Sequence, residues 1–176
     1  MKRLAVTVLA LTVASMSAAC DDDDNPTGPD DSVTFTAQLS PANEVPPITS
    51  VEATGSGNVT IRFDLSRDGA GTITAATANF TVNLTGFPST TAINIAHIHG
   101  PAAAGATGPI VVDTGLAAGQ VTLTNGVGAF TRDGIAVLPA SLSAVQDMLN
   151  NPANYYFNVH SAMHGSGVVR GPLVRQ

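Results

Sequence analysis

Cysteine and long apolar runs are both scarce in this sequence of 176 residues. Cys20 is the only cysteine, so a disulfide within the chain is excluded. The apolar run from Leu4 to Met16 is shorter than the roughly 20 residues that a membrane-spanning helix needs, and no later run reaches that length. We therefore expect no transmembrane helix in the mature protein.

Basic side chains are few as well. The chain has 7 Lys and Arg against 13 Asp and Glu, but Lys2 and Arg3 precede the apolar run and six of the aspartates precede Ser32. From Ser32 onwards, seven acidic side chains face five arginines and no lysine. A nearly neutral domain without a basic stripe has no cationic surface for the phosphates of a nucleic acid, and it has no aromatic platform beside arginines for the bases. A nucleic-acid partner is therefore excluded.

Familiar catalytic motifs are also missing. The sequence has no Gly-X-Ser-X-Gly elbow and no phosphate-cradling loop, and Cys20 precedes the domain. Carboxylates are sparse, and we expect most of them to be solvated turn residues; they are Glu44, Glu52, Asp64, Asp68, Asp113, Asp133 and Asp147. We therefore predict no catalytic residues and favour a protein that is not an enzyme.

The N-terminus predicts export from a bacterial cytoplasm. Basic residues, a short apolar run and the small residues Ser17-Ala18-Ala19 form a signal peptide over residues 1–19. Two interpretations of Cys20 stay open. The four residues 17–20 resemble a lipobox, which would make Cys20 a lipidated membrane anchor, although Ser17 stands where that motif usually has Leu. They would equally serve an ordinary signal peptidase that cuts after Ala19.

An unpaired cysteine in an oxidising compartment favours lipidation. Residues 20–31 follow with six aspartates and no apolar side chain to bury, which predicts a disordered acidic tether. We expect the protein to be extracytoplasmic, either lipid-anchored in the bacterial cell envelope through Cys20 or secreted.

Residues 32–176 predict one all-β domain. Runs of Val, Thr, Ile and Phe alternate with clusters of turn residues, and the long helical periodicity of an α/β protein is missing. We expect an antiparallel β-sandwich, immunoglobulin-like or superoxide-dismutase-like. The predicted strands are Val33–Leu39, Asn58–Leu65, Thr72–Leu84, Ala92–His99, Ile110–Asp113, Gln120–Thr124, Ala129–Thr131, Tyr155–His160 and Val168–Val174.

One short helix is predicted near residues 141–150. Leu142, Val145 and Leu149 recur at helical spacing, and Ser141 precedes them as a candidate N-cap. We expect this helix to pack over one end of the sandwich.

Two strands alternate strictly between apolar and polar residues. In Phe80–Thr85 this pattern places one face in the core and the other in water. Tyr155–His160 follows the same pattern, so Tyr156, Asn158 and His160 are expected to share the wet face.

Four stretches stand out along the domain: LSPANEVPP (39–47), AHIHGPA (96–102), YFNVHS (156–161) and GVVRGPL (167–173). In this order they resemble the motifs of the CHRD family, the domain named after chordin and widespread in bacterial exported proteins. The sequence departs from the family pattern at Val168, where Glu is usual, and at Ser161, where Thr is common. The resemblance implies an extracellular β-domain without established catalytic activity.

Histidines form a candidate metal site. His97 and His99 are two apart on a predicted strand and project from one face, while His160 lies on another strand and His164 follows in a turn. A His-X-His pair with a distant His suits copper or zinc. The alternative is structural, with imidazoles bonded to loop carbonyls. For a metal we expect His97, His99 and His160 as ligands and His164 as a weaker fourth.

A second candidate group joins the first and last motifs. We expect Glu44 and Arg170 to form a bidentate, partly buried ion pair that fixes structure, with Asn43 and Asn158 orienting the same network. The sequence therefore favours a non-catalytic envelope module that binds an extracellular protein or a polysaccharide, with copper or zinc as the only cofactors that its residues suggest. A copper- or zinc-binding envelope protein is the alternative.

Overall fold

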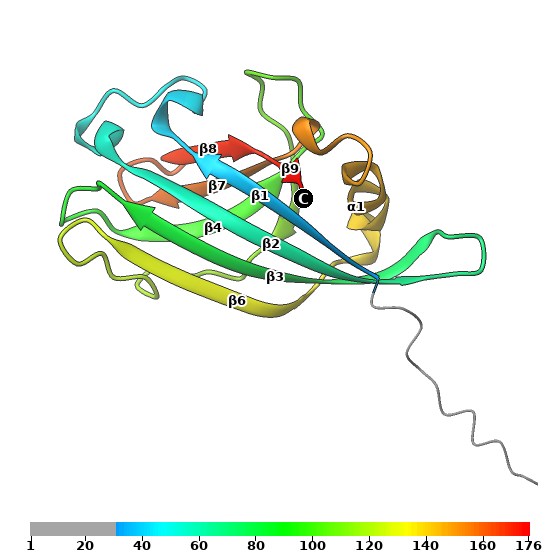
Figure 1. The fold of residues 1–176 in the computed structure, drawn as a ribbon. Helices are drawn as coiled ribbons and strands as arrows, with labels where there is room; N and C mark the ends of the chain where they lie inside the picture. Colours follow the sequence, from blue (N-terminus) through cyan, green and yellow to red (C-terminus); the bar gives the residue numbers. More distant parts are fainter. Residues whose placement is uncertain (1–30) are drawn as a thin grey trace, which may run out of the picture.

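Two antiparallel sheets face each other in the computed structural model, which describes residues 31–176 (Figure 1). The predicted signal peptide (1–19), Cys20 and nearly all of the tether lie outside the described residues. The larger sheet has the strand order β6-β3-β2-β1-β9, and the smaller has the order β5-β4-β7-β8. The predicted antiparallel β-sandwich with one short α-helix is confirmed. No helix among the described residues is long and apolar enough to cross a membrane.

Nine strands and one α-helix carry the fold of the described residues. The strands are β1 (Ser32–Leu39), β2 (Ser56–Arg67), β3 (Ile73–Thr85), β4 (Ile93–His99), β5 (Ile110–Asp113), β6 (Gly128–Ala136), β7 (Tyr156–Ser161), β8 (Val169–Pro172) and β9 (Val174–Arg175). The helix is α1 (Leu142–Met148), and the short 3-10 turns are η1 (Pro41–Asn43), η2 (Val51–Thr54), η3 (Pro139–Ser141) and η4 (Pro152–Asn154).

The core lies between the two sheets and follows the predicted alternation. In Phe80–Thr85 of β3, the apolar members are buried and the polar members exposed. Phe80 meets Phe157 of β7 from the opposite sheet, with ring centroids 5.9 Å apart. Apolar side chains removed from water on both inner faces stabilise the sandwich by about 25 cal/mol per Å² buried.

The predicted strand over Gln120–Thr124 does not form. This stretch makes only isolated bridges, from Val121 to Ile93 and from Thr124 to Val127. The second bridge closes a tight turn in which Asn125 and Gly126 have φ values of 51° and 76°. The end of the predicted strand, at Thr124, therefore forms part of the turn that leads into β6.

Helix α1 confirms the predicted spacing but not the predicted cap. Val145 and Met148 are fully buried, and Leu142 and Leu149 pack partly buried against the core at the end of the sandwich (Figure 1). Ser141 makes no side-chain capping bond, because its backbone is already helical and η3 runs directly into the helix.

The sheets meet along a seam between β1 and β8. Ser40, just after β1, exchanges two main-chain hydrogen bonds with Arg170 of β8, at 3.0 and 3.3 Å. Gly171 lies so close to β1 that a Cβ there would come within 1.9 Å of the carbonyl oxygen of Gln38. The chain then crosses from β8 to β9, which pairs with β1 in the other sheet.

The outer face of the smaller sheet is covered rather than wet. Tyr156, Asn158 and His160 are only 8, 2 and 5 % exposed, so the expectation that this face is in water was wrong. Loops from three other parts of the chain lie over it: the 41–54 segment, the 100–109 loop and the 162–167 loop. Polar side chains are thereby enclosed in a second, outer layer.

Candidate functional site

Three histidines meet in this outer layer. Strand β4 supplies His97 and His99, and the neighbouring strand β7 supplies His160 opposite Ile95. Ile95 shares the face of His97, as its spacing predicts, but a register shift between residues 93 and 95 turns Ile93 into the core. The three histidines therefore project from one face of two adjacent strands.

Their ring nitrogens converge. One ring nitrogen from each of His97, His99 and His160 lies within 4.8 Å of those of the other two. His97 Nδ1 is 3.1 Å from His99 Nε2, and the rings of His97 and His160 have centroids 4.6 Å apart. The spacing-based prediction that these three residues lie together is met by the geometry.

Two loop carbonyls set the protonation of two rings. His99 Nδ1 lies 2.9 Å from the carbonyl of Gly108, and His160 Nδ1 lies 3.0 Å from the carbonyl of Gly165. A carbonyl only accepts hydrogen bonds, so each Nδ1 carries the proton and each Nε2 keeps a lone pair. The structural role proposed for these histidines, pinning the loops, is thus present as well.

Burial keeps all three imidazoles neutral near pH 7. Desolvation, followed by the neighbouring His160 and His99, lowers the pKa of His97 to about 4. Desolvation also lowers the pKa of His99 and of His160, although the hydrogen bonds to Gly108 and Gly165 act in the opposite direction. Neutral imidazole is the form that binds metal ions.

His164 belongs to a different cluster. Its Nδ1 lies 2.7 Å from Oε2 of Glu52, and Ser161 donates a hydrogen bond of 2.6 Å to the same oxygen. The structure therefore places the expected fourth ligand against a carboxylate, and outside the group of three histidines.

Sequence reasoning assigned Glu52 to solvent, but Glu52 is only 2 % exposed. Burial raises its pKa, but the hydrogen bonds from Ser161 and His164 act in the opposite direction, and the pKa lies below its ordinary value. The partners follow more than 100 residues later, at a separation of 109 for Ser161 and 112 for His164, so no local pattern could have identified them.

The expected pair of Glu44 and Arg170 forms, with a different geometry. Both side chains are buried, but Arg170 Nε and Glu44 Oε2 are 4.0 Å apart, so the predicted bidentate contact is wrong. The guanidinium instead donates hydrogen bonds to the main-chain carbonyls of Asn43 and Ala106, the latter at 3.1 Å. These carbonyls occupy the directions that a bidentate carboxylate would need.

Asn43 contacts Arg170 directly, whereas Asn158 hydrogen-bonds to a neighbouring loop and to neither Glu44 nor Arg170. Asn43 donates to the main-chain carbonyl of Arg170 at 3.0 Å, and Asn158 donates to that of Ser166 at 3.4 Å. Gly167, with φ of 131°, leaves the space that the side chains of Asn158 and Glu44 fill. Within the described residues, Glu44 Oε1, Asn158 Oδ1 and His160 Nε2 are buried without a hydrogen-bond partner.

The burial of Glu44 disfavours the ionised form of its carboxyl group at neutral pH. Burial raises its pKa from 4.5 to about 7, against the opposing attraction of Arg170. The carboxyl group is therefore partly protonated near neutral pH, and the positive charge of Arg170 is incompletely balanced.

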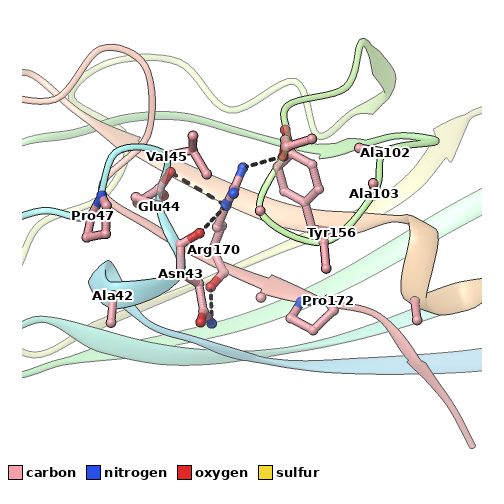
Figure 2. A pocket seen from close by; sticks show the side chains of 15 residues that line it. Ala42, Asn43, Glu44, Val45, Pro47, Ala102, Ala103, Tyr156, Arg170 and Pro172 are labelled. Carbon is pink, nitrogen blue, oxygen red and sulfur yellow. Dashed lines mark hydrogen bonds and ion pairs between the residues drawn. The ribbon is translucent and has the colours of Figure 1, made fainter.

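A groove of about 540 Å³ opens beside this network (Figure 2). Its walls are the 42–47 segment and the alanine-rich loop 102–106, and its floor is formed by Tyr156, Arg170 and Pro172. The Tyr156 ring stacks on His99 at 5.0 Å, while the Arg170 guanidinium lies 4.6 Å from the Tyr156 ring centroid. Tyr156 thus contacts the histidine cluster through His99 and at the same time forms part of the groove floor.

One of three comparisons with known proteins gives a match, and it agrees with the motifs. A search of curated proteins and of solved structures found no match. Residues 35–173 match the model of the CHRD domain, which covers both sheets, the groove and the three histidines, and the chain therefore belongs to the CHRD domain family.

Proposed function

We propose that this protein is an exported, non-catalytic module of the bacterial cell envelope that binds an extracellular protein in the groove. Membership of the CHRD family supports a binding role without catalysis. The observation that carries the proposal is the groove, which combines small apolar walls with one buried arginine at its floor.

The groove chemistry favours a protein segment over a polysaccharide. Ala42, Val45 and Pro47 face the loop 102–106 across the groove, so its walls are mostly aliphatic. Sugar hydroxyls buried against these walls would lose more hydrogen bonds to water than the few polar groups of the groove replace. Tyr156 is the one aromatic residue of the lining, but its ring is buried and already contacts His99 and Arg170, so it provides no stacking platform.

Arg170 would orient the bound protein segment through its free N–H groups. Its guanidinium has five N–H donors, and its hydrogen bonds to Asn43 and Ala106 use two of them. An extended segment with apolar side chains and a carbonyl or carboxylate oxygen toward Arg170 fits this arrangement.

Attachment through Cys20 belongs to the same proposal. A lipidated Cys20 would hold the protein at a membrane surface with residues 21–31 as a spacer, whereas cleavage after Ala19 alone would release it. Labelling cells with a fatty-acid analogue tests this: we expect labelled wild-type protein and unlabelled Cys20→Ala protein. An unlabelled wild type would leave secretion as the route.

Photocrosslinking in intact cells tests the groove. A photoreactive phenylalanine analogue at Ala103, an exposed residue of the groove wall, should give a discrete crosslinked protein. The same analogue at exposed Ala118, outside the groove, is the matched control.

The Val45→Asp substitution adds a charge to the opposite wall and should remove the crosslink while leaving the folded domain intact. Identical products from positions 103 and 118 would contradict the proposal. A protease-resistant, heterogeneous product that a glycosidase removes would instead identify a polysaccharide partner and refute the preference for protein.

A further inference from the structure

We propose that His97, His99 and His160 together bind one copper ion. The inference concerns the histidine cluster and does not depend on the proposed partner in the groove. It starts from the topology, because adjacent antiparallel strands β4 and β7 place all three side chains on one covered face.

The two loop carbonyls prepare the site for a metal. Metal-binding histidines commonly donate their second ring N–H to a backbone carbonyl, which fixes the tautomer and the orientation of the ring. Gly108 does this for His99 and Gly165 does it for His160, at 2.9 and 3.0 Å. In His160 the remaining Nε2 lone pair has no partner, whereas His99 Nε2 now lies 3.1 Å from His97 Nδ1 and would exchange that contact for the ion.

His160 Nε2 is a second, independent indication. It is buried and has no hydrogen-bond partner among the described residues. Buried polar atoms are nearly always satisfied, so an orphaned lone pair beside two other imidazoles calls for an electron-pair acceptor. A copper ion meets that need, and His97, with its centroid 4.6 Å from that of His160, completes three nitrogens.

The distances allow coordination after a small contraction. Ring nitrogens bound to one such ion at about 2.0–2.1 Å lie less than about 4.2 Å apart. The three nitrogens now lie within 4.8 Å of one another. Small rotations of the rings would bring them to bonding distance while the carbonyl bonds of His99 and His160 are kept.

The donor set favours copper over zinc. The cluster found among the described residues contains three imidazoles and no carboxylate or thiolate. Nitrogen ligands bind Cu²⁺ more tightly than Zn²⁺, as the general order of metal affinities requires. With neutral ligands the buried site carries the full charge of its ion, and a monovalent Cu⁺ is less costly to desolvate than a divalent ion.

The test uses the protein produced without a His-tag from its full-length coding sequence. The purified protein is titrated with Cu⁺ under ascorbate and anaerobic conditions, in competition with a chromogenic Cu⁺ chelator, and bound metal is measured by mass spectrometry. We expect one copper per chain, which an equal concentration of Zn²⁺ does not displace.

Two variants and one control locate the site. His99→Phe keeps a ring that can stack on Tyr156, and His160→Gln keeps a polar group near Gly165; each should weaken copper binding by at least about 100-fold. His164→Gln, outside the cluster, should leave it unchanged. Thermal unfolding followed by circular dichroism shows which variants are folded.

Nitrogen-detected NMR of ¹⁵N-histidine-labelled wild type keeps the proposal testable if a variant does not fold. Because Cu⁺ is diamagnetic, its addition should shift the Nε2 resonances of His99 and His160 and leave those of His164 in place. Unshifted Nε2 resonances, full copper binding by a folded cluster variant, or displacement of copper by equimolar zinc would each overturn the proposal.

Discussion

Replacing Glu44 by glutamine should make the protein more stable at alkaline pH and leave it almost unchanged at acidic pH. The folded structure raises the pKa of Glu44 from 4.5 to about 7, chiefly because burial disfavours the charged carboxylate. The folded state therefore binds this proton more tightly than the unfolded chain. The corresponding stability is fully present below about pH 4.5 and is lost as the pH rises to about 7.

The magnitude follows from the same values. The interval from 4.5 to about 7 corresponds to about 3 kcal/mol at about 1.4 kcal/mol per pH unit. A glutamine side chain cannot ionise, so the difference in unfolding free energy between Glu44→Gln and wild type should grow by about 3 kcal/mol between about pH 4.5 and about pH 8.

Urea unfolding followed by circular dichroism at about pH 4.5, 6 and 8 measures that difference. Asp133→Asn, at an exposed position, removes the same charge and should show no such trend. If wild type is instead the more stable protein at the alkaline end, the single 4.0 Å contact between Glu44 and Arg170 outweighs desolvation and the reasoning is refuted.

Three further predictions concern stability. Gly171→Ala should lower the free energy of unfolding in urea by more than about 4 kcal/mol or prevent folding, because the new Cβ would lie 1.9 Å from a β1 carbonyl oxygen. Gly69→Ala is the control: its new Cβ would meet open space, so the free energy of unfolding should change by less than about 0.5 kcal/mol. Tyr155→Phe should cost about 1–2 kcal/mol in the same assay, since Asp147 accepts a 2.9 Å hydrogen bond from the tyrosine hydroxyl. Glu52→Ala should lower the free energy of unfolding by about 3–5 kcal/mol at about pH 7 and by less at about pH 3. The ionised carboxylate, whose pKa is lowered in the fold, stabilises the folded state above about pH 4.5, and this stabilisation is lost as the pH falls. An equal loss of stability at both pH values would contradict the prediction.

Local patterns were enough to predict most of the strands and the helix. The alternation in Phe80–Thr85 and the helical spacing of Val145 depend on residues close in the sequence, and both appear as expected. The shared face of His97 and His99 also followed from strand geometry, whereas their convergence with His160 required β4 and β7 to be neighbours, which local spacing does not determine.

Burial on the outer face of the smaller sheet was not predictable in this way. The pattern of β7 correctly separates its two faces, but whether Asn158 meets water or loops depends on how the 162–167 loop folds back and on the segment with Glu44, far earlier in the chain. Glu52 has the same explanation, since Ser161 lies 109 residues later. Periodicity reports which way a side chain points, and only tertiary structure decides what covers it.

The direction of β1 determines how the groove would be presented. Asp31, the first described residue, precedes β1, and the groove wall formed by residues 42–47 follows the other end of that strand (Figure 1). Eight extended residues separate the two ends by about 26 Å. A protein held by the segment before Asp31 would therefore carry the proposed binding surface on the side remote from the attachment point, where a partner arriving from outside would meet it first.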